Sequence, residues 1–260
     1  MKRILTLALA LLSAGAIAAS AVDLQTHNRT YIMGYGTQAP GMEDYEGLLQ
    51  YQVGIKAPLL DLTALGIPIE VVGAFSDFAL WDVNAESSPF REHNYQPEAW
   101  VTWLPDSSGT LRSYLDDVRI GFRHVSTGVD SIDSMGWNRV FLSTDLFYTI
   151  EELGLTLHLT PEIWYVVSED ENTEGIGSKD FTGLGIDDFG GKVRLTVDQD
   201  LGTLALELGR RHGLAEVTFD LIPGLNQYVV YLQAFRGQME SLNSFDQYRT
   251  GFGAGIALSR

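Results

Sequence analysis

The stretch Asp117-Val118-Arg119-Ile120-Gly121-Phe122-Arg123-His124-Val125-Ser126 decides the fold. From Val118 to Phe122, apolar side chains alternate with charged side chains or glycine. A β-strand turns successive side chains to opposite faces, so this segment has one apolar face and one polar face. The same pattern occurs in a soluble sandwich, whose apolar face lies inside, and in a transmembrane barrel, whose apolar face meets lipid. By itself the stretch predicts an amphipathic strand and leaves both architectures open.

The alternation recurs along the whole chain, in segments separated by turns or acidic loops. We expect about twelve strands, near residues 29–36, 46–57, 68–82, 94–104, 115–126, 137–150, 155–168, 187–198, 203–211, 214–222, 227–236 and 247–258. An even number of strands, aromatic residues near strand ends, and short turns that alternate with longer loops are typical of bacterial outer-membrane barrels. The sequence therefore predicts an all-β fold, a transmembrane antiparallel β-barrel of about 12 strands, with its short turns on the periplasmic side.

The first residues have the features of a secretory signal peptide. Lys2 and Arg3 precede an apolar run over residues 4–12, and small residues follow up to Ala21. This order is typical of signal peptides, and we expect cleavage after Ala19 or Ala21. We therefore divide the chain into a cleaved signal peptide (1–21), an N-terminal segment with the first strand (22–45), and the remainder of the single 12-stranded barrel (46–260).

The composition excludes several classes of protein. The chain has a formal net charge of −17, which argues against nucleic acid as a partner and permits the binding of divalent cations. It has no cysteine, which excludes disulfides, a thiolate nucleophile and cysteine-bound metals. After the signal segment there is no apolar run of about 18 residues, so a helical membrane protein is excluded.

Two polar side chains end the apolar face of the opening stretch. Counting by twos from Phe122 places His124 and then Ser126 on that face. The apolar face of the following strand reads back to Asn138, so pairing of the two strands should bring Asn138 near His124. If both termini are periplasmic, the cluster lies at the extracellular end of the wall. A serine hydroxyl becomes a nucleophile when an imidazole takes its proton and a third group orients that imidazole.

These polar groups have two interpretations. Hydrogen-bonding groups that face lipid are costly unless they satisfy one another, and a Ser–His–Asn chain would do so. The alternative is a set of interfacial polar residues near lipid headgroups, because His-x-Ser alone is a weak signal. The residue pattern on its own leaves the two open.

Four blocks of sequence have a pattern in common with one known family. They are 86–95 (Glu-Ser-Ser-Pro-Phe-Arg-Glu-His-Asn-Tyr), 122–128 with 134–139 (Phe-Arg-His-Val-Ser-Thr-Gly and Ser-Met-Gly-Trp-Asn-Arg), Pro161 with 164–167 (Trp-Tyr-Val-Val), and Gly237 with 240–242 (Glu-Ser-Leu). The most specific features are the His-x-Ser-x-Gly core and the step of 14 residues from histidine to asparagine. Through these blocks, roughly residues 45–260 resemble the bacterial outer membrane phospholipase A family.

The resemblance implies a twelve-stranded barrel in the bacterial cell outer membrane, with its active site at the extracellular side. It implies calcium-dependent hydrolysis of the acyl ester bonds of membrane phospholipids (phospholipase A1/A2 and lysophospholipase type) and a homodimer as the active form. By position, Ser126 matches the nucleophile, His124 the general base and Asn138 the orienting amide. The backbone N–H of Gly128 matches an oxyanion donor.

The resemblance also implies a set of oxygen ligands for Ca²⁺. These are the Val129 carbonyl, the Ser134 hydroxyl and the carbonyl of Ser87 of the partner subunit. An acidic ligand falls at Asp170 or Glu171, with Glu171 as the better match. Oxygen ligands of this kind are what a hard cation requires.

The sequence departs from the family pattern beside the expected calcium site. Met135-Gly136 replaces a more polar pair, and Ser131 stands where an acidic side chain is usual. Both departures affect the expectation of calcium binding more than that of the Ser–His–Asn unit. The rival hypothesis is an inert structural or porin-like barrel that retains the site. Charges on the polar face predict a filled interior rather than a wide pore, and they are Arg119, Arg123, Arg139, Lys192, Arg194, Asp117, Asp145 and Glu162.

Overall fold

The computed structural model describes residues 23–38, 47–105, 113–129, 134–173, 188–220, 227–238 and 242–259. The expected signal peptide and its cleavage sites lie outside these residues, so the proposed division of the chain stays a prediction. No helix within the described ranges is long and apolar enough to cross a membrane.

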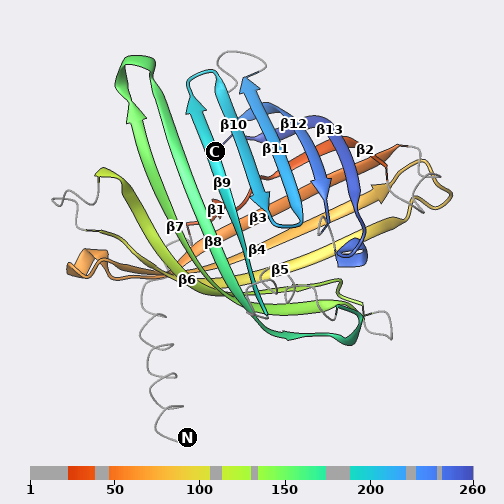
Figure 1. Cartoon of the computed structure of the whole chain (residues 1–260), viewed down its shortest axis with the longest axis horizontal. Helices are drawn as coiled ribbons and strands as arrows, with labels where there is room; N and C mark the ends of the chain where they lie inside the picture. The colour runs from red at the N-terminus through yellow and green to blue at the C-terminus, as the bar shows by residue number, and fades with distance from the viewer. Residues whose placement is uncertain are drawn as a thin grey trace, which may run out of the picture.

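The described residues form one antiparallel sheet of thirteen strands (Figure 1). The strands are β1 (Gln25–Thr26), β2 (Tyr31–Gln38), β3 (Leu48–Asp61), β4 (Ile69–Asp82), β5 (Phe90–Trp103), β6 (Leu115–Ser126), β7 (Gly136–Ile150), β8 (Leu155–Glu169), β9 (Phe189–Gln199), β10 (Gly202–Gly209), β11 (His212–Asp220), β12 (Tyr228–Gly237) and β13 (Arg249–Leu258). Single turns of 3-10 helix are η1 (Thr63–Leu65), η3 (Glu151–Leu153), η4 (Glu171–Thr173) and η6 (Leu242–Ser244).

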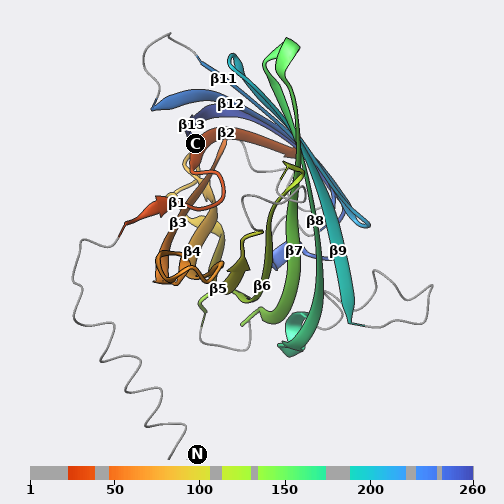
Figure 2. The ribbon, with the colours of Figure 1, turned by 90° about the vertical axis from the view of Figure 1, so that its left-hand side faces the viewer.

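The strands β2 to β13 close into a barrel. Each pairs with the next in sequence, and β13 pairs with β2, so the sheet has no free edge along this ring. Figure 2 shows the strands arranged in a ring, with β3 to β5 on one side and β7 to β9 on the other. The prediction of an all-β antiparallel barrel of about 12 strands is confirmed.

β1 is a short continuation of the first barrel strand. It pairs with β3 at residues 55–56, whereas β2 pairs with β3 at residues 48–52. Between the two, the His27 N–H donates to the Gly54 carbonyl at 2.9 Å, and the His27 ring lies 3.0 Å from Glu98 inside the barrel. A Cβ at Gly54 would collide with the His27 carbonyl oxygen, so only glycine permits this close approach.

β5 begins at Phe90, earlier than the start near residue 94 that the sequence indicated. The pairing of β4 with β5 changes register between Leu80 and Trp81, so Trp81 pairs with Phe90 while Leu80 pairs with Glu92. A bulge of this kind breaks the alternation of faces. The start of the strand was therefore hidden in the sequence pattern.

The outer wall of the barrel is apolar. On β6, Ile120 is 56% exposed and Phe122 is 43% exposed, and Val140 and Leu142 on β7 are exposed beside them. Side chains between them in sequence point inward, and Phe141 is buried. A continuous exposed apolar surface of this kind is what a lipid-facing wall requires.

The interior holds paired charges, as the sequence predicted. Arg123 lies between two carboxylates, with Nε 2.6 Å from Glu98 and Nη1 2.9 Å from Glu162. Lys192 pairs with Glu207 at 3.1 Å. Other inward pairs are Arg119 with Asp117 and Arg194 with Glu216. A cavity of about 480 Å³ remains among these groups, lined mostly by polar and charged side chains.

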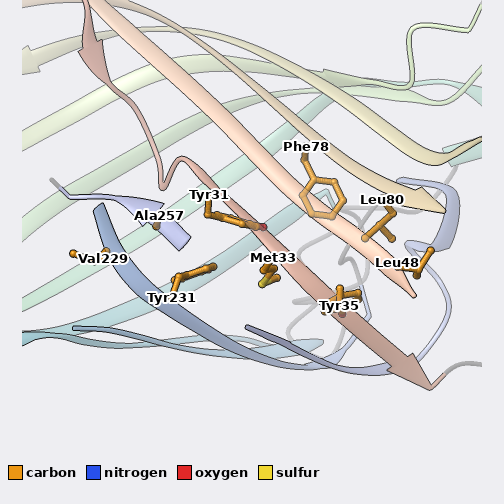
Figure 3. Close-up of a cluster of buried hydrophobic side chains, with 9 residues drawn as sticks. All are labelled: Tyr31, Met33, Tyr35, Leu48, Phe78, Leu80, Val229, Tyr231 and Ala257. Atoms are coloured by element: carbon orange, nitrogen blue, oxygen red, sulfur yellow. The ribbon is translucent and has the colours of Figure 1, made fainter. Parts of the chain in front are cut away.

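Two clusters of buried apolar side chains pack inside the barrel. The first gathers side chains from β2, β3, β4, β12 and β13 (Figure 3), namely Tyr31, Met33, Tyr35, Leu48, Phe78, Leu80, Val229, Tyr231 and Ala257. The second lies behind β6 to β8 and comprises Val72, Trp100, Val125, Trp137, Phe141, Trp164, Val166 and Leu242. Leu242 comes from η6, whose backbone N–H at Leu242 donates to Asn94 Oδ1 at 3.1 Å. The second cluster supports the wall that carries the candidate site.

Candidate active site

The candidate site lies on the outer face where β6 ends and β7 begins. The two strands pair His124 with Asn138 and Ser126 with Gly136. Val125, between the two site residues of β6, is buried in the interior cluster. His124 and Ser126 therefore share the opposite, outer face and are half-buried there.

A hydrogen bond joins the imidazole to the amide. His124 Nδ1 lies 2.9 Å from Asn138 Oδ1. Because an amide oxygen only accepts, this contact assigns the ring proton to Nδ1 and leaves the lone pair on Nε2. The arrangement orients the ring so that Nε2 is able to act as a base.

Ser168 completes the polar chain, and the sequence did not indicate it. Asn138 Nδ2 donates to Ser168 Oγ at 2.9 Å, so both ends of the amide are held. By simple alternation Ser168 would point inward with Val166, which is buried. The pairing of β7 with β8 skips Val167, matching Asn138 with Ser168 and Arg139 with Val166. This bulge turns Ser168 to the outer face.

Ser126 lies on the same face as His124, two residues along the strand. In the part of the chain that the structure describes, no hydrogen bond links the Ser126 hydroxyl to the imidazole. Hydrogen bonds of catalytic groups are often long or poorly aligned without substrate and tighten in the complex. The backbone thus brings Ser126 beside His124, and their side chains are not yet bonded.

Gly128 occupies a backbone conformation and a space that suit glycine alone. Its φ is +69°, in the left-handed region. A Cβ at Gly128 would lie 2.5 Å from Cε2 of Tyr95, so the tyrosine ring packs directly against the glycine backbone. The residue is exposed on the outside and lies two residues after Ser126.

A group of oxygen atoms lies beside Gly136, the strand partner of Ser126. Ser134 Oγ donates to Asp170 Oδ2 at 3.3 Å, and the Asp170 N–H donates to the Gly136 carbonyl at 2.9 Å. A Cβ at Gly136 would lie 3.1 Å from Asp170 Oδ2, which shows how close the carboxylate comes to this strand. The Thr173 hydroxyl also donates to the Gly136 carbonyl, at 2.7 Å. These contacts fix the carboxylate of Asp170 next to the site.

The other expected calcium ligands make no hydrogen bond to Ser134 or Asp170 among the described residues. Glu171 begins η4 and is exposed, and Val129 is 49% exposed at the end of its described segment. Ser87 lies in the exposed turn between β4 and β5 and has a φ of +65°. Ser131 lies outside the described residues. Among the residues that are described, no cluster of three or more histidine or acidic side chains could hold a metal ion.

The oxygen atoms at the site nevertheless fit a hard cation. The Asp170 carboxylate and the Ser134 hydroxyl are in contact, and both groups are ligands that Ca²⁺ accepts. Calcium sites also use backbone carbonyls, which a search for acidic clusters does not detect. The donor set therefore suits Ca²⁺, with a single carboxylate in place of a cluster.

Comparison with known proteins identifies the family. A family model described as phospholipase A1 matches residues 17–258. The chain belongs to the phospholipase A1 family. Phospholipase A1 of Salmonella typhimurium is 29% identical over 205 residues, which cover 74% of this chain and 63% of the relative. Phospholipase A1 of Escherichia coli is 28% identical over 203 residues, with the same two coverages of 74% and 63%. This chain thus spans less than two thirds of the length of these relatives.

Solved structures of the family share the fold. Outer membrane phospholipase A from Escherichia coli superposes with a TM-score of 0.71 at 20% identity, covering 91% of this chain and 98% of that chain. A Salmonella typhi outer membrane phospholipase, solved as a dimer with bound calcium, gives a TM-score of 0.70 at 19% identity, covering 96% and 97%. The resemblance found in the sequence is confirmed, and so is the barrel.

Proposed function

We propose that this phospholipase A1 family member resides in the bacterial outer membrane and hydrolyses the acyl ester bonds of phospholipids. The observation that carries the proposal is the 2.9 Å contact between His124 Nδ1 and Asn138 Oδ1 on the outer face that also holds Ser126. Polar groups on an apolar wall are costly unless they satisfy one another by hydrogen bonds, as His124 and Asn138 do. Family membership supports the same reaction.

The residues divide the reaction between them. Ser126 Oγ attacks the ester carbonyl while Nε2 of His124 takes its proton, and Asn138 holds the ring in place. The N–H of Gly128 donates to the oxyanion that forms. When the tetrahedral intermediate collapses, His124 returns the proton to the departing alkoxide, and an acyl-enzyme remains. His124 then deprotonates a water molecule that attacks the acyl-enzyme, and Ser126 is regenerated with release of a fatty acid.

The position of the site determines how substrate arrives. The nucleophile faces lipid at the end of β6, so a phospholipid reaches it by lateral movement within the bilayer. Short turns such as η3 lie at the opposite end of the barrel, and short turns are periplasmic in proteins of this kind. This arrangement supports our proposal that the site lies at the extracellular side. The candidate substrates are the ester bonds at both acylated glycerol carbons of a phospholipid, which correspond to A1 and A2 activity. The remaining ester bond of a lysophospholipid is a further candidate, which corresponds to lysophospholipase activity.

We propose Ca²⁺ as the cofactor, held by the Ser134 hydroxyl, the Asp170 carboxylate and the Val129 carbonyl. Asp170 is preferred to the alternative, Glu171, because its carboxylate contacts Ser134. Bound calcium would supply positive charge next to the oxyanion. The remaining ligand is the carbonyl of Ser87 of the partner subunit, which makes the active form a homodimer.

A passive, porin-like barrel is the less supported alternative. Paired charges such as Arg123 with Glu162 cross the interior, and the space left between them is about 480 Å³. A wide aqueous channel would need a more open interior.

The test is hydrolysis of a phospholipid in mixed detergent micelles by the refolded chain, with calcium and with a chelator. We expect release of fatty acid that depends on calcium. The matched control is Ser126→Ala, which removes one outer-face hydroxyl and should leave a folded, heat-modifiable barrel with below about 1% of the activity. Absence of hydrolysis by the folded wild-type chain, or clear activity in Ser126→Ala, would refute the proposal.

A further inference from the structure

A second group of polar side chains lies on the lipid-facing wall, next to the site on β4 and β5. Strand pairing places Asp77 of β4 opposite Tyr95 of β5, and Tyr95 opposite Ser126 of β6. His93 lies two residues from Tyr95 on the same face. Asp77, His93 and Tyr95 thus form one patch that reaches the strand carrying the proposed nucleophile.

Contacts join these three residues in series. His93 Nδ1 lies 2.9 Å from Asp77 Oδ1, and His93 Nε2 lies 3.4 Å from the Tyr51 hydroxyl. The rings of His93 and Tyr95 stack with centroids 4.6 Å apart and an interplanar angle of 26°. A carboxylate and an imidazole on an apolar wall are costly when each is alone. The approach of His93 Nδ1 to Asp77 Oδ1 lacks the alignment of a hydrogen bond, so the two groups are neighbours that interact by charge. We call Asp77, His93 and Tyr95 the outer stack.

The outer stack ends against the backbone of Gly128. The distance of 2.5 Å between Tyr95 Cε2 and a Cβ placed at Gly128 shows that the ring occupies the space where a side chain would go. Gly128 is exposed and has a left-handed backbone conformation. The ring therefore packs against the Cα side of Gly128.

The backbone pairing near Gly128 is sparse on the side of β5. β5 and β6 pair at Tyr95 with Ser126 and again at Glu98 with Arg123, and the described ladder has no pair between these two points. Pro97, which lacks an N–H, lies in the gap. On the β5 side, the end of β6 is thus joined by a single backbone pair, and the packing of Tyr95 adds to it.

We propose that the outer stack is a positioning device, in which Asp77 and His93 hold the Tyr95 ring and the ring fixes the Gly128 N–H for the oxyanion. The inference rests on the proposed function, in which Gly128 supplies that donor. In this proposal Tyr95, His93 and Asp77 affect the reaction through Gly128 and take no part in the bond changes. Removing the ring should therefore reduce kcat and leave KM nearly unchanged.

The experiment compares Tyr95→Leu, Tyr95→Phe and His93→Ala in the refolded full chain, with a soluble short-chain phospholipid in detergent. We expect Tyr95→Leu to lower kcat by about 10- to 100-fold, since a displacement of about 1 Å has that effect. Tyr95→Phe keeps the ring and should restore most of kcat. His93→Ala should lower kcat less, and the double variant should be no worse than Tyr95→Leu, because both act along one path.

A second measurement does not depend on activity. Hydrogen exchange of a peptide that contains Gly128 should be faster in Tyr95→Leu and in His93→Ala than in wild type. The matched control is Tyr148→Leu, which removes an exposed tyrosine that stacks on Tyr114, with centroids 6.5 Å apart, away from the site on β7. It should leave both kcat and the exchange near Gly128 unchanged.

The outcomes separate the inference from the proposed function. An inactive wild-type chain would refute the proposed function, while hydrogen exchange would still test the stack. If wild type is active and Tyr95→Leu keeps its kcat, the inference is wrong. A rise in KM alone would assign the ring to substrate binding, and an equal loss in Tyr95→Phe would assign chemistry to the hydroxyl; either overturns it. If Tyr95→Leu does not refold, His93→Ala decides the question, because it keeps the tyrosine and removes only a residue that holds its ring.

Discussion

The orientation of the His124 ring depends on the Asn138 amide, which a hydrogen bond to Ser168 holds in turn. Asn138 accepts from the ring at 2.9 Å and donates to Ser168 at 2.9 Å, so it cannot rotate without losing both bonds. A neutral amide stabilises a protonated imidazole less than a carboxylate would. At the scale of single residues, the site therefore relies on geometry more than on charge.

This division predicts unequal effects of two substitutions. His124→Ala removes the base and should lower kcat by about 10⁴-fold or more. Asn138→Ala leaves the base with looser geometry and should cost about 10²-fold. The measurement is kcat on a micellar phospholipid, with heat-modifiability as the check on folding. Equal and complete loss in two folded variants would contradict the assigned roles.

The neighbouring carboxylates give a second prediction. Asp170→Asn should raise the calcium concentration for half-maximal activity by about tenfold or more, because the site loses its carboxylate charge. Glu171→Gln is the matched control one residue away, in an exposed position, and should change it little. Ser134→Ala should shift it in the same direction as Asp170→Asn. A larger shift in Glu171→Gln would return the ligand role to Glu171.

At the scale of strands, alternation accounts for what the sequence predicted and for what it missed. β6 has no bulge between Val118 and Ser126, so counting by twos placed His124 and Ser126 correctly on one face. Ser168 was missed because the bulge at Val167 reverses the alternation at that point. A bulge depends on the register in which two strands pair, and the sequence of one strand alone does not determine that register.

Positions that depend on loops and on neighbouring strands were also beyond the sequence. The choice between Asp170 and Glu171 turns on where β8 ends and η4 begins. The contact of Tyr95 with Gly128 arises from the pairing of β5 with β6. No spacing within one strand indicates either.

The interior of the strands gives a prediction about stability. Arg123 is 11% exposed and binds both Glu98 and Glu162, so Arg123→Met should leave two buried carboxylates short of a partner. The cost should be about 3–5 kcal/mol in the free energy of unfolding. The measurement is the urea unfolding curve in detergent, with the more exposed Arg119→Met as the matched control. A loss no greater than that of Arg119→Met would show that the two pairs of Arg123 stabilise the barrel no more than the single, more exposed pair of Arg119.

At the scale of the whole molecule, the site is incomplete in one chain under the proposed mechanism. Ser134 and Asp170 supply part of an oxygen set, and Ser87 of the partner subunit is proposed to supply another ligand. Calcium binding and self-association should therefore strengthen each other. Such coupling would keep the enzyme silent in an intact membrane and active where lipid order is lost.

This coupling is tested by titrating calcium while measuring hydrolysis and cross-linked dimer in the same samples. The two should rise together, and Ser134→Ala should shift both to higher calcium. Full activity in a chelator, or in a chain held as a monomer by covalent modification, would refute the coupling. The barrel and the Ser–His–Asn assignments would be unaffected by that result.

The closure of the barrel also sets an order of events during synthesis. β13, at the end of the chain, pairs with β2 near its beginning, and Leu242 of η6, shortly before β13, packs in the cluster behind β6 to β8. The wall that carries Ser126 therefore gains its full backing only after the last strands have been delivered. Under the proposed function, a chain in transit, whose C-terminal strands are still unplaced, would lack a finished catalytic site. Hydrolysis under this proposal would then begin only once the barrel is closed.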